Sequence, residues 1–156
     1  MKNLSILLLC AGLLQACTLN LPDSVADTGY ENKIPVIEFD KYSVYFDYNN
    51  DGFVNKGETV GLQVWLKNTG TRAAKGVEAL FSINSPYVSN FTPGTGIDYG
   101  DIAIGETVMA YFYVNYSTIQ FTVSSSTPEG TQIPISISIV DESDNTWTSS
   151  FNVAIQ

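Results

Sequence analysis

Hydrophobic and polar residues alternate along most of the chain from Ile34 onward. Strict alternation is typical of β-strands with one buried face, because successive side chains of a strand point to opposite faces of the sheet. Turns rich in Gly, Asn and Asp separate seven such runs, at 34–46, 59–67, 76–84, 87–91, 107–116, 131–140 and 146–155. In the first run the phase changes near Asp40 and Lys41, which predicts a β-bulge or a switch between sheets.

No segment of helical length shows a period of 3.6 residues, so the pattern predicts an all-β protein. About seven alternating strands over a stretch of this length are the signature of an immunoglobulin-like sandwich of two antiparallel sheets. We expect this sandwich to span residues 34–156. A domain of that size buries enough surface to fold without disulfides.

The N-terminus has a different pattern. A short basic start precedes an apolar run, Leu4–Leu14, which is too short to cross a bilayer as a helix, and the run ends at Leu14-Gln15-Ala16-Cys17. This arrangement resembles a bacterial lipoprotein signal peptide. The resemblance implies a leader over residues 1–16, lipid attached to Cys17, and a flexible tether over 17–33. An ordinary secretory signal and a buried helix are the alternatives.

Cysteine usage agrees with lipidation, because the only other cysteine, Cys10, lies within the expected leader. Acyl chains on Cys17 would make membrane attachment effectively permanent. We therefore expect a protein of the bacterial cell envelope, with Thr18 favouring the outer membrane over retention at the inner one. Two short motifs, Asp23-Ser24-Val25 and Asp27-Thr28-Gly29, resemble the O-glycan acceptors of Bacteroidetes.

The charge balance excludes several classes of function. The chain has 7 Lys and Arg, 16 Asp and Glu and no His, for a net charge of −9. We expect no nucleic-acid partner, since phosphate binding needs clustered basic residues. Without histidine there is no Ser-His-Asp or Cys-His catalysis and no His-ligated zinc. The other acidic clusters fall at predicted turns, so we expect no enzymatic activity.

Residues 47–58 fit the twelve-residue calcium loop D-x-[DN]-x-[DN]-G-x5-E. Ca²⁺ takes several oxygen ligands on a curled backbone. In this chain the pattern assigns them to Asp47, Asn49, Asp51, the Phe53 carbonyl, Asn55 and Glu58. An ordinary turn is the alternative, because Gly57-Glu58-Thr59 recurs as Gly105-Glu106-Thr107 with no acidic loop before it. Both interpretations stay open.

The same loop, the later stretch Leu66-Lys67-Asn68-Thr69-Gly70 and the second Gly-Glu-Thr turn together carry a wider resemblance. They are similar to the immunoglobulin-like accessory modules of bacterial surface and secreted proteins. Such modules include cell-adhesion-related bacterial domains and the sandwiches associated with gingipain-type peptidases. The resemblance implies a fold and an envelope setting. It does not imply catalysis, because these modules usually accompany a separate catalytic domain.

Three aromatic residues are candidates for ligand binding. Trp65 alternates out of phase with the apolar residues of its run, and Tyr111 and Tyr113 do the same in theirs. An exposed strip of these rings on neighbouring strands would suit a sugar ring or a protein partner. Cross-strand packing of the rings, or cover by a loop, is the alternative.

These observations lead to two hypotheses for function. The first is a lipid-anchored, non-catalytic interaction or structural module that binds a protein partner or supports adhesion at the cell envelope. The second is a carbohydrate-binding module that uses the aromatic strip. The sequence does not identify the ligand.

Overall fold

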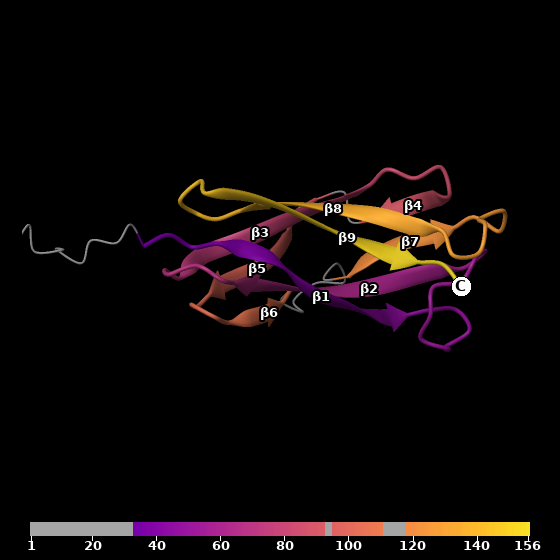
Figure 1. Ribbon diagram of the computed structural model, residues 1–156, viewed down its shortest axis with the longest axis horizontal. Coiled ribbons are helices and arrows are strands. Elements are labelled where there is room, and N and C mark those ends of the chain that lie inside the picture. Colours follow the sequence, from indigo (N-terminus) through magenta and orange to yellow (C-terminus); the bar gives the residue numbers. More distant parts are fainter. Residues whose placement is uncertain (1–32, 93–94, 111–117) are drawn as a thin grey trace, which may run out of the picture. The chain divides into compact units, whose positions relative to one another are not determined.

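The computed structural model describes residues 33–92, 95–110 and 118–156. These residues form an all-β structure without helices (Figure 1). In chain order the strands are β1 Ile37–Phe46, β2 Thr59–Asn68, β3 Ala74–Ile83, β4 Val88–Thr92, β5 Ile97–Ile102, β6 Thr107–Met109, β7 Ile119–Val123, β8 Gln132–Val140 and β9 Thr146–Ala154. The predicted immunoglobulin-like sandwich is confirmed, with nine strands in the described residues where about seven were expected.

The strands form two antiparallel sheets packed face to face. One sheet has the order β1-β2-β7-β4, with β6 also paired to β2, and the other has the order β5-β3-β8-β9. The extra strands are β5 and β7, which the alternation pattern did not single out. The expected run 107–116 contributes β6 at its start, and residues 111–116 lie outside the described residues.

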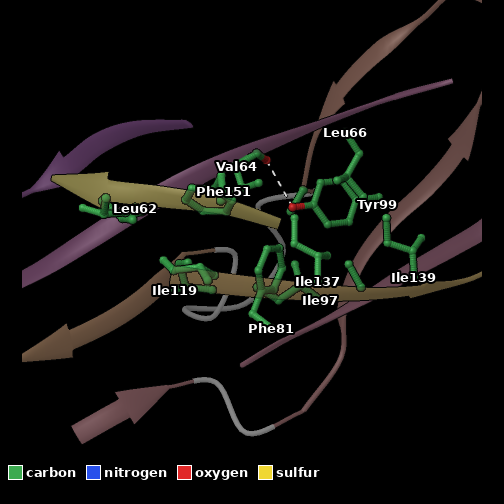
Figure 2. Packing of buried hydrophobic residues seen from close by; sticks show 14 of the residues in the cluster. Leu62, Val64, Leu66, Phe81, Ile97, Tyr99, Ile119, Ile137, Ile139 and Phe151 are labelled. Atoms are coloured by element: carbon green, nitrogen blue, oxygen red, sulfur yellow. Dashed lines mark hydrogen bonds between the residues drawn. The ribbon is translucent and has the colours of Figure 1, made fainter. Parts of the chain in front are cut away.

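The core lies between the two sheets and follows the predicted alternation (Figure 2). Ile133, Ile135, Ile137 and Ile139 of β8 are at most 2% exposed. Tyr99 of β5 crosses this core, and its buried hydroxyl donates a hydrogen bond to the Val64 carbonyl of β2 at 3.1 Å. Burial raises the pKa of Tyr99, and the bond joins one sheet to the other.

Strand β1 closes one side of the sandwich over β9. Its pairing with β2 shifts register between Phe39 and Lys41, which is the bulge predicted near Asp40. The Phe39 ring stacks on Phe151 of β9 at a centroid distance of 4.4 Å, and the Phe39 backbone N–H donates to the Ser149 hydroxyl at 3.2 Å. The two sheets therefore contact each other along this side through side chains.

The β1–β2 hairpin separates two ends of the domain. Ile37 pairs with Asn68 at one end and Phe46 pairs with Gly61 at the other. The chain enters at the Ile37 end, and the loop 47–58 lies at the Phe46 end (Figure 1). Ten residues of strand correspond to about 30 Å. All of this belongs to one compact unit, Asn32–Gln156.

Candidate functional site

The loop 47–58 curls around the carboxylate of Asp47. Both oxygens of this buried side chain accept backbone hydrogen bonds, from Asp51 N–H and Gly52 N–H, each at 3.1 Å. Gly52 has φ +80°, a conformation that residues other than glycine rarely adopt. The Asp-x-x-x-Asp-Gly sequence thus builds a tight turn whose donors are satisfied by its own first carboxylate.

Asp51 is the centre of a second set of hydrogen bonds in the loop. Its carboxylate accepts the Phe53 backbone N–H at 2.8 Å and the side-chain amides of Asn49 and Asn55 at 3.0 and 2.9 Å. The hydrogen bond from Phe53 is the main reason why the pKa of Asp51 lies below its usual range. The amide groups of both asparagines, which the calcium pattern assigns as ligands, here contact a carboxylate of the same loop.

Glu58 belongs to a turn that occurs twice in the chain. Its carboxylate accepts the backbone N–H of Asn55 at 2.7 Å, and Glu106 accepts the backbone N–H of Ala103, also three residues earlier, at 2.8 Å. The preceding glycines have φ of +83° and +73°. The repeated Gly-Glu-Thr motif is therefore a strand-entry turn, and this role accounts for Glu58 without a metal.

In the described part of the chain, no three or more acidic, His or Cys side chains converge as a group that could hold a metal ion. Asp47, Asp51 and Glu58 each accept backbone hydrogen bonds instead. The other three residues that the calcium pattern assigns as ligands lie in the same loop; they are Asn49, Phe53 and Asn55.

Exposed aromatic rings gather around this loop. The described residues have eight exposed large hydrophobic side chains, and half of them lie in the short stretch 45–53. They are Tyr45 and Phe46 at the end of β1 and Tyr48 and Phe53 in the loop, with Tyr48 81% exposed. Such a concentration of apolar surface at one end of a domain is typical of a contact surface.

A groove of about 460 Å³ lies beside Phe53. Its lining includes Tyr42 and Val44 of β1 and Ala154 and Gln156 near the C-terminus. The C-terminus is fixed here, because Gln156 N–H donates to the Val54 carbonyl at 2.9 Å. Loop, groove and C-terminus thus form one continuous end of the sandwich.

Trp65 lies in the middle of β2, half-buried between the fully buried Val64 and Leu66. The Lys41 ammonium is 5.4 Å from its ring centroid, and Met109 of β6 lies opposite it. The run that holds Tyr111 does begin beside β2, but Tyr111 and Tyr113 lie outside the described residues, as does Cys17.

Sequence reasoning missed the role of Asn68. Its fully buried side chain accepts the backbone N–H groups of Val36 and Gly70 at 3.3 and 3.0 Å. Its amide donates to the carbonyls of Arg72 and Ile102 at 2.8 and 3.1 Å. Asn68 therefore joins the chain entry, the turn after β2 and the end of β5. The motif Lys-Asn-Thr-Gly could have signalled this position.

Gly70 of the same motif has no room for a side chain. A Cβ atom there would lie 2.4 Å from both the Ile34 carbonyl oxygen and the Val36 nitrogen. Thr69 N–H and Thr71 N–H also donate to the carbonyls of Val36 and Ile34, at 2.8 and 2.9 Å. Together with Asn68, these contacts hold the chain where it enters the sandwich.

The remaining acidic residues with side-chain contacts have structural roles. Asp101 forms an ion pair with Lys75 and accepts the Gly76 N–H at 3.0 Å, and these two contacts hold the pKa of Asp101 below its usual range. The buried Asp141 accepts the backbone N–H groups of Ser143 and Asn145. Asp101 therefore links β5 to β3, and Asp141 stabilises its own turn.

No protein-family model and no curated protein matches the sequence. Among the residues with a described placement, none forms a helix long and apolar enough to cross a membrane. The described residues thus form an all-β sandwich with four exposed aromatic side chains at one end.

Proposed function

We propose that this chain is a lipid-anchored, non-catalytic interaction module of the bacterial cell envelope. The observation that carries the proposal is the gathering of exposed aromatic rings around the loop 47–58, beside a groove that the end of β1 and the C-terminus line. Aromatic residues are the side chains most enriched at the centres of binding interfaces.

The place where the chain enters the sandwich supports this function. A tether from Cys17 would join the domain at its entry end, and the aromatic loop lies at the opposite end of the β1–β2 hairpin. A chain with net charge −9 is also repelled by anionic headgroups. The anchor would therefore leave the aromatic end accessible to a partner.

Site-specific photo-crosslinking in the full-length chain tests the contact surface. We expect a photoreactive residue at Tyr48 to form discrete adducts in intact cells. The matched control position is Ile104, which is 60% exposed but lies at the entry end, because neighbouring Gly105 donates its N–H to the Asn68 carbonyl. Equal adduct formation at both positions, or none at Tyr48, would contradict the proposal.

A carbohydrate-binding module is the second candidate, and the observation that favours it is the placement of Trp65 on the outer face of its sheet with Lys41 above the ring. An indole beside a flexible cation offers both a stacking surface and a hydrogen-bond donor to a sugar. Screening against a glycan array tests this, with Trp65→Ala expected to abolish any signal. If Trp65→Ala leaves the array signal unchanged, Trp65 is not part of the glycan-binding site.

We also propose that the loop 47–58 binds Ca²⁺ weakly. Asp47, Asn49 and Asp51 alternate along its curl, and Gly52 permits the sharp turn that such loops need. Weak binding is expected because the hydrogen bonds within the loop must compete with the cation for the same oxygens.

A further inference from the structure

A trough crosses the outer face of the sheet β5-β3-β8-β9. It has a volume of about 470 Å³ and is lined by residues 78–80 of β3, 138–140 of β8 and 146–148 of β9, with Gly96 just before β5. Sites for small organic molecules typically measure about 300–1,000 Å³. The trough is therefore large enough for such a ligand.

The sheet register explains the shape of the trough. Ala79, Ile139 and Trp147 are paired across the three strands and pack toward the core, so their backbone forms the floor. Two rows of exposed side chains form the walls, Glu78, Val140 and Thr146 on one side and Leu80, Ser138 and Thr148 on the other. The walls are about 7 Å apart along each strand, and the three strands span about 10 Å. This narrow shape suits one unbranched chain better than a ring.

The middle of the trough is apolar. Leu80 and Val140 lie on neighbouring strands and are 48% and 37% exposed. They are two of the eight exposed large hydrophobic side chains in the described residues, and the other six lie in the stretch 45–53 or beside the chain entry. A ligand chain in the trough would cover apolar surface that water now contacts, which favours binding.

The end of the trough near β5 is negatively charged. Glu78 and Asp98 are exposed register partners on β3 and β5, and like charges directly opposite each other repel. A Cβ atom on Gly96 would lie 3.2 Å from Glu78 Oε2, so the carboxylate leans over this glycine. Within the described parts of the chain, Glu78 has neither an ion pair nor a side-chain hydrogen bond, and Lys75 of β3 is bound to Asp101. A cation is missing at this position.

We propose that the trough binds a small organic cation with an ammonium group on an unbranched apolar chain. The ammonium group lies between the carboxylates of Glu78 and Asp98 and offsets their repulsion, and the chain lies across Leu80 and Val140. Charge complementarity selects this ligand, because an anion is repelled by both carboxylates and a neutral chain leaves them uncompensated. A lysine side chain of a protein partner has similar chemistry but would fill only part of the trough.

The trough is separate from the surfaces that the proposed function uses. β9 runs from the trough at Thr146 to Ala154, and the next residue, Ile155, forms a bridge with Val54 of the loop 47–58. Trp65 belongs to the other sheet. A failure of binding in the trough would leave crosslinking at the loop unaffected, so the two tests are independent.

An NMR titration of the chain from Thr18, which contains the whole core, measures the binding. The probes are hexylammonium, hexanol and hexanoate, which share one chain and differ in charge. We expect hexylammonium to shift the backbone amides of 78–80, 138–140 and 146–148 and to bind about fivefold or more tightly than hexanol, with hexanoate the weakest. Equal binding of hexylammonium and hexanol, or shifts confined to other residues, would overturn the proposal. Tighter binding of an acetylated lysine amide than of hexylammonium would also overturn it, in favour of a basic side chain of a protein partner.

A matched pair of glutamine variants locates the cation. Glu78→Gln should remove most of the advantage of hexylammonium over hexanol. Glu38→Gln makes the same change at an exposed position on β1 of the other sheet and should leave both affinities as in the parent. Neither variant should lower the melting temperature. Equal weakening by the two variants would show that net charge attracts the probe, and it would exclude a site at Glu78.

Leu80→Ser tests the apolar part of the trough. It shortens one wall, so hexylammonium and hexanol should both bind more weakly by a similar factor. Affinities equal to those of the parent chain would show that the probe's chain does not lie across Leu80 and would contradict the proposed position.

Discussion

Replacing Asn68 with alanine removes the side chain that joins three segments of the sandwich. Asn68 is fully buried, accepts hydrogen bonds from Val36 and Gly70, and donates to Arg72 and Ile102. Alanine cannot replace any of these bonds. Two N–H groups and two carbonyls of the backbone therefore lose a partner at once.

The size of the effect follows from how buried those groups are. A hydrogen bond contributes about 0.5–1.5 kcal/mol net, and a buried group left unsatisfied costs about 1–3 kcal/mol. The bond to the Ile102 carbonyl is buried, and the other three are partly buried, so water can reach some of the freed groups. We expect Asn68→Ala to lower the free energy of unfolding by about 2–4 kcal/mol, or about 10 °C in melting temperature.

Urea unfolding followed by intrinsic fluorescence measures this loss, with Asn152→Ala as the control. Asn152 is an exposed asparagine on β9, and its truncation should change stability by no more than about 0.5 kcal/mol. If Asn68→Ala were as stable as the control, the side chain would not hold the chain entry, and the contacts seen around it would have no energetic weight.

Three further predictions concern other parts of the domain. Gly70→Ala places a Cβ atom against the Ile34 carbonyl and should lower the free energy of unfolding by at least about 2 kcal/mol. An unchanged urea midpoint would contradict this. Tyr99→Phe removes the hydrogen bond between the two sheets and should lower the free energy of unfolding by about 1–2 kcal/mol. An unchanged melting temperature would show that the hydrogen bond does not stabilise the fold. Calcium at about ten times a dissociation constant of 10⁻⁴–10⁻³ M should add about 1.4 kcal/mol to the free energy of unfolding. This raises the melting temperature by a few degrees, and Asp51→Ala should abolish the rise. A melting curve with calcium that is identical to the curve with chelator would show that the loop is an ordinary turn.

The alternation of side chains predicted most of the fold, and its failures have physical reasons. β8 and β9 were recognised because they are long and regular, and every second residue of β8 is buried. β5 was missed because Asp98, Gly100 and Asp101 resemble a turn, although Tyr99 is deeply buried. β7 was also missed, although its buried residues Ile119, Phe121 and Val123 alternate strictly and the equally short β4 was predicted.

The candidate site was predicted less completely than the fold. The sequence identified the loop 47–58 and suggested that Glu58 belongs to a repeated turn, because both follow from local spacing. The four exposed rings lie close together in the sequence, within 45–53, whereas the role of Asn68 depends on Val36 and Ile102, 32 and 34 residues away. Contacts of that kind arise only when the sheets assemble.

Membrane attachment through Cys17 is the part of the proposed function that a single measurement tests most directly. We predict that the full-length chain expressed in a Gram-negative bacterium incorporates labelled palmitate and partitions into the detergent phase. Cys17→Ser should lose both properties, while its folded domain keeps the same melting temperature. A Cys17→Ser chain that still carries label and still partitions with detergent would contradict a lipid-anchored envelope module.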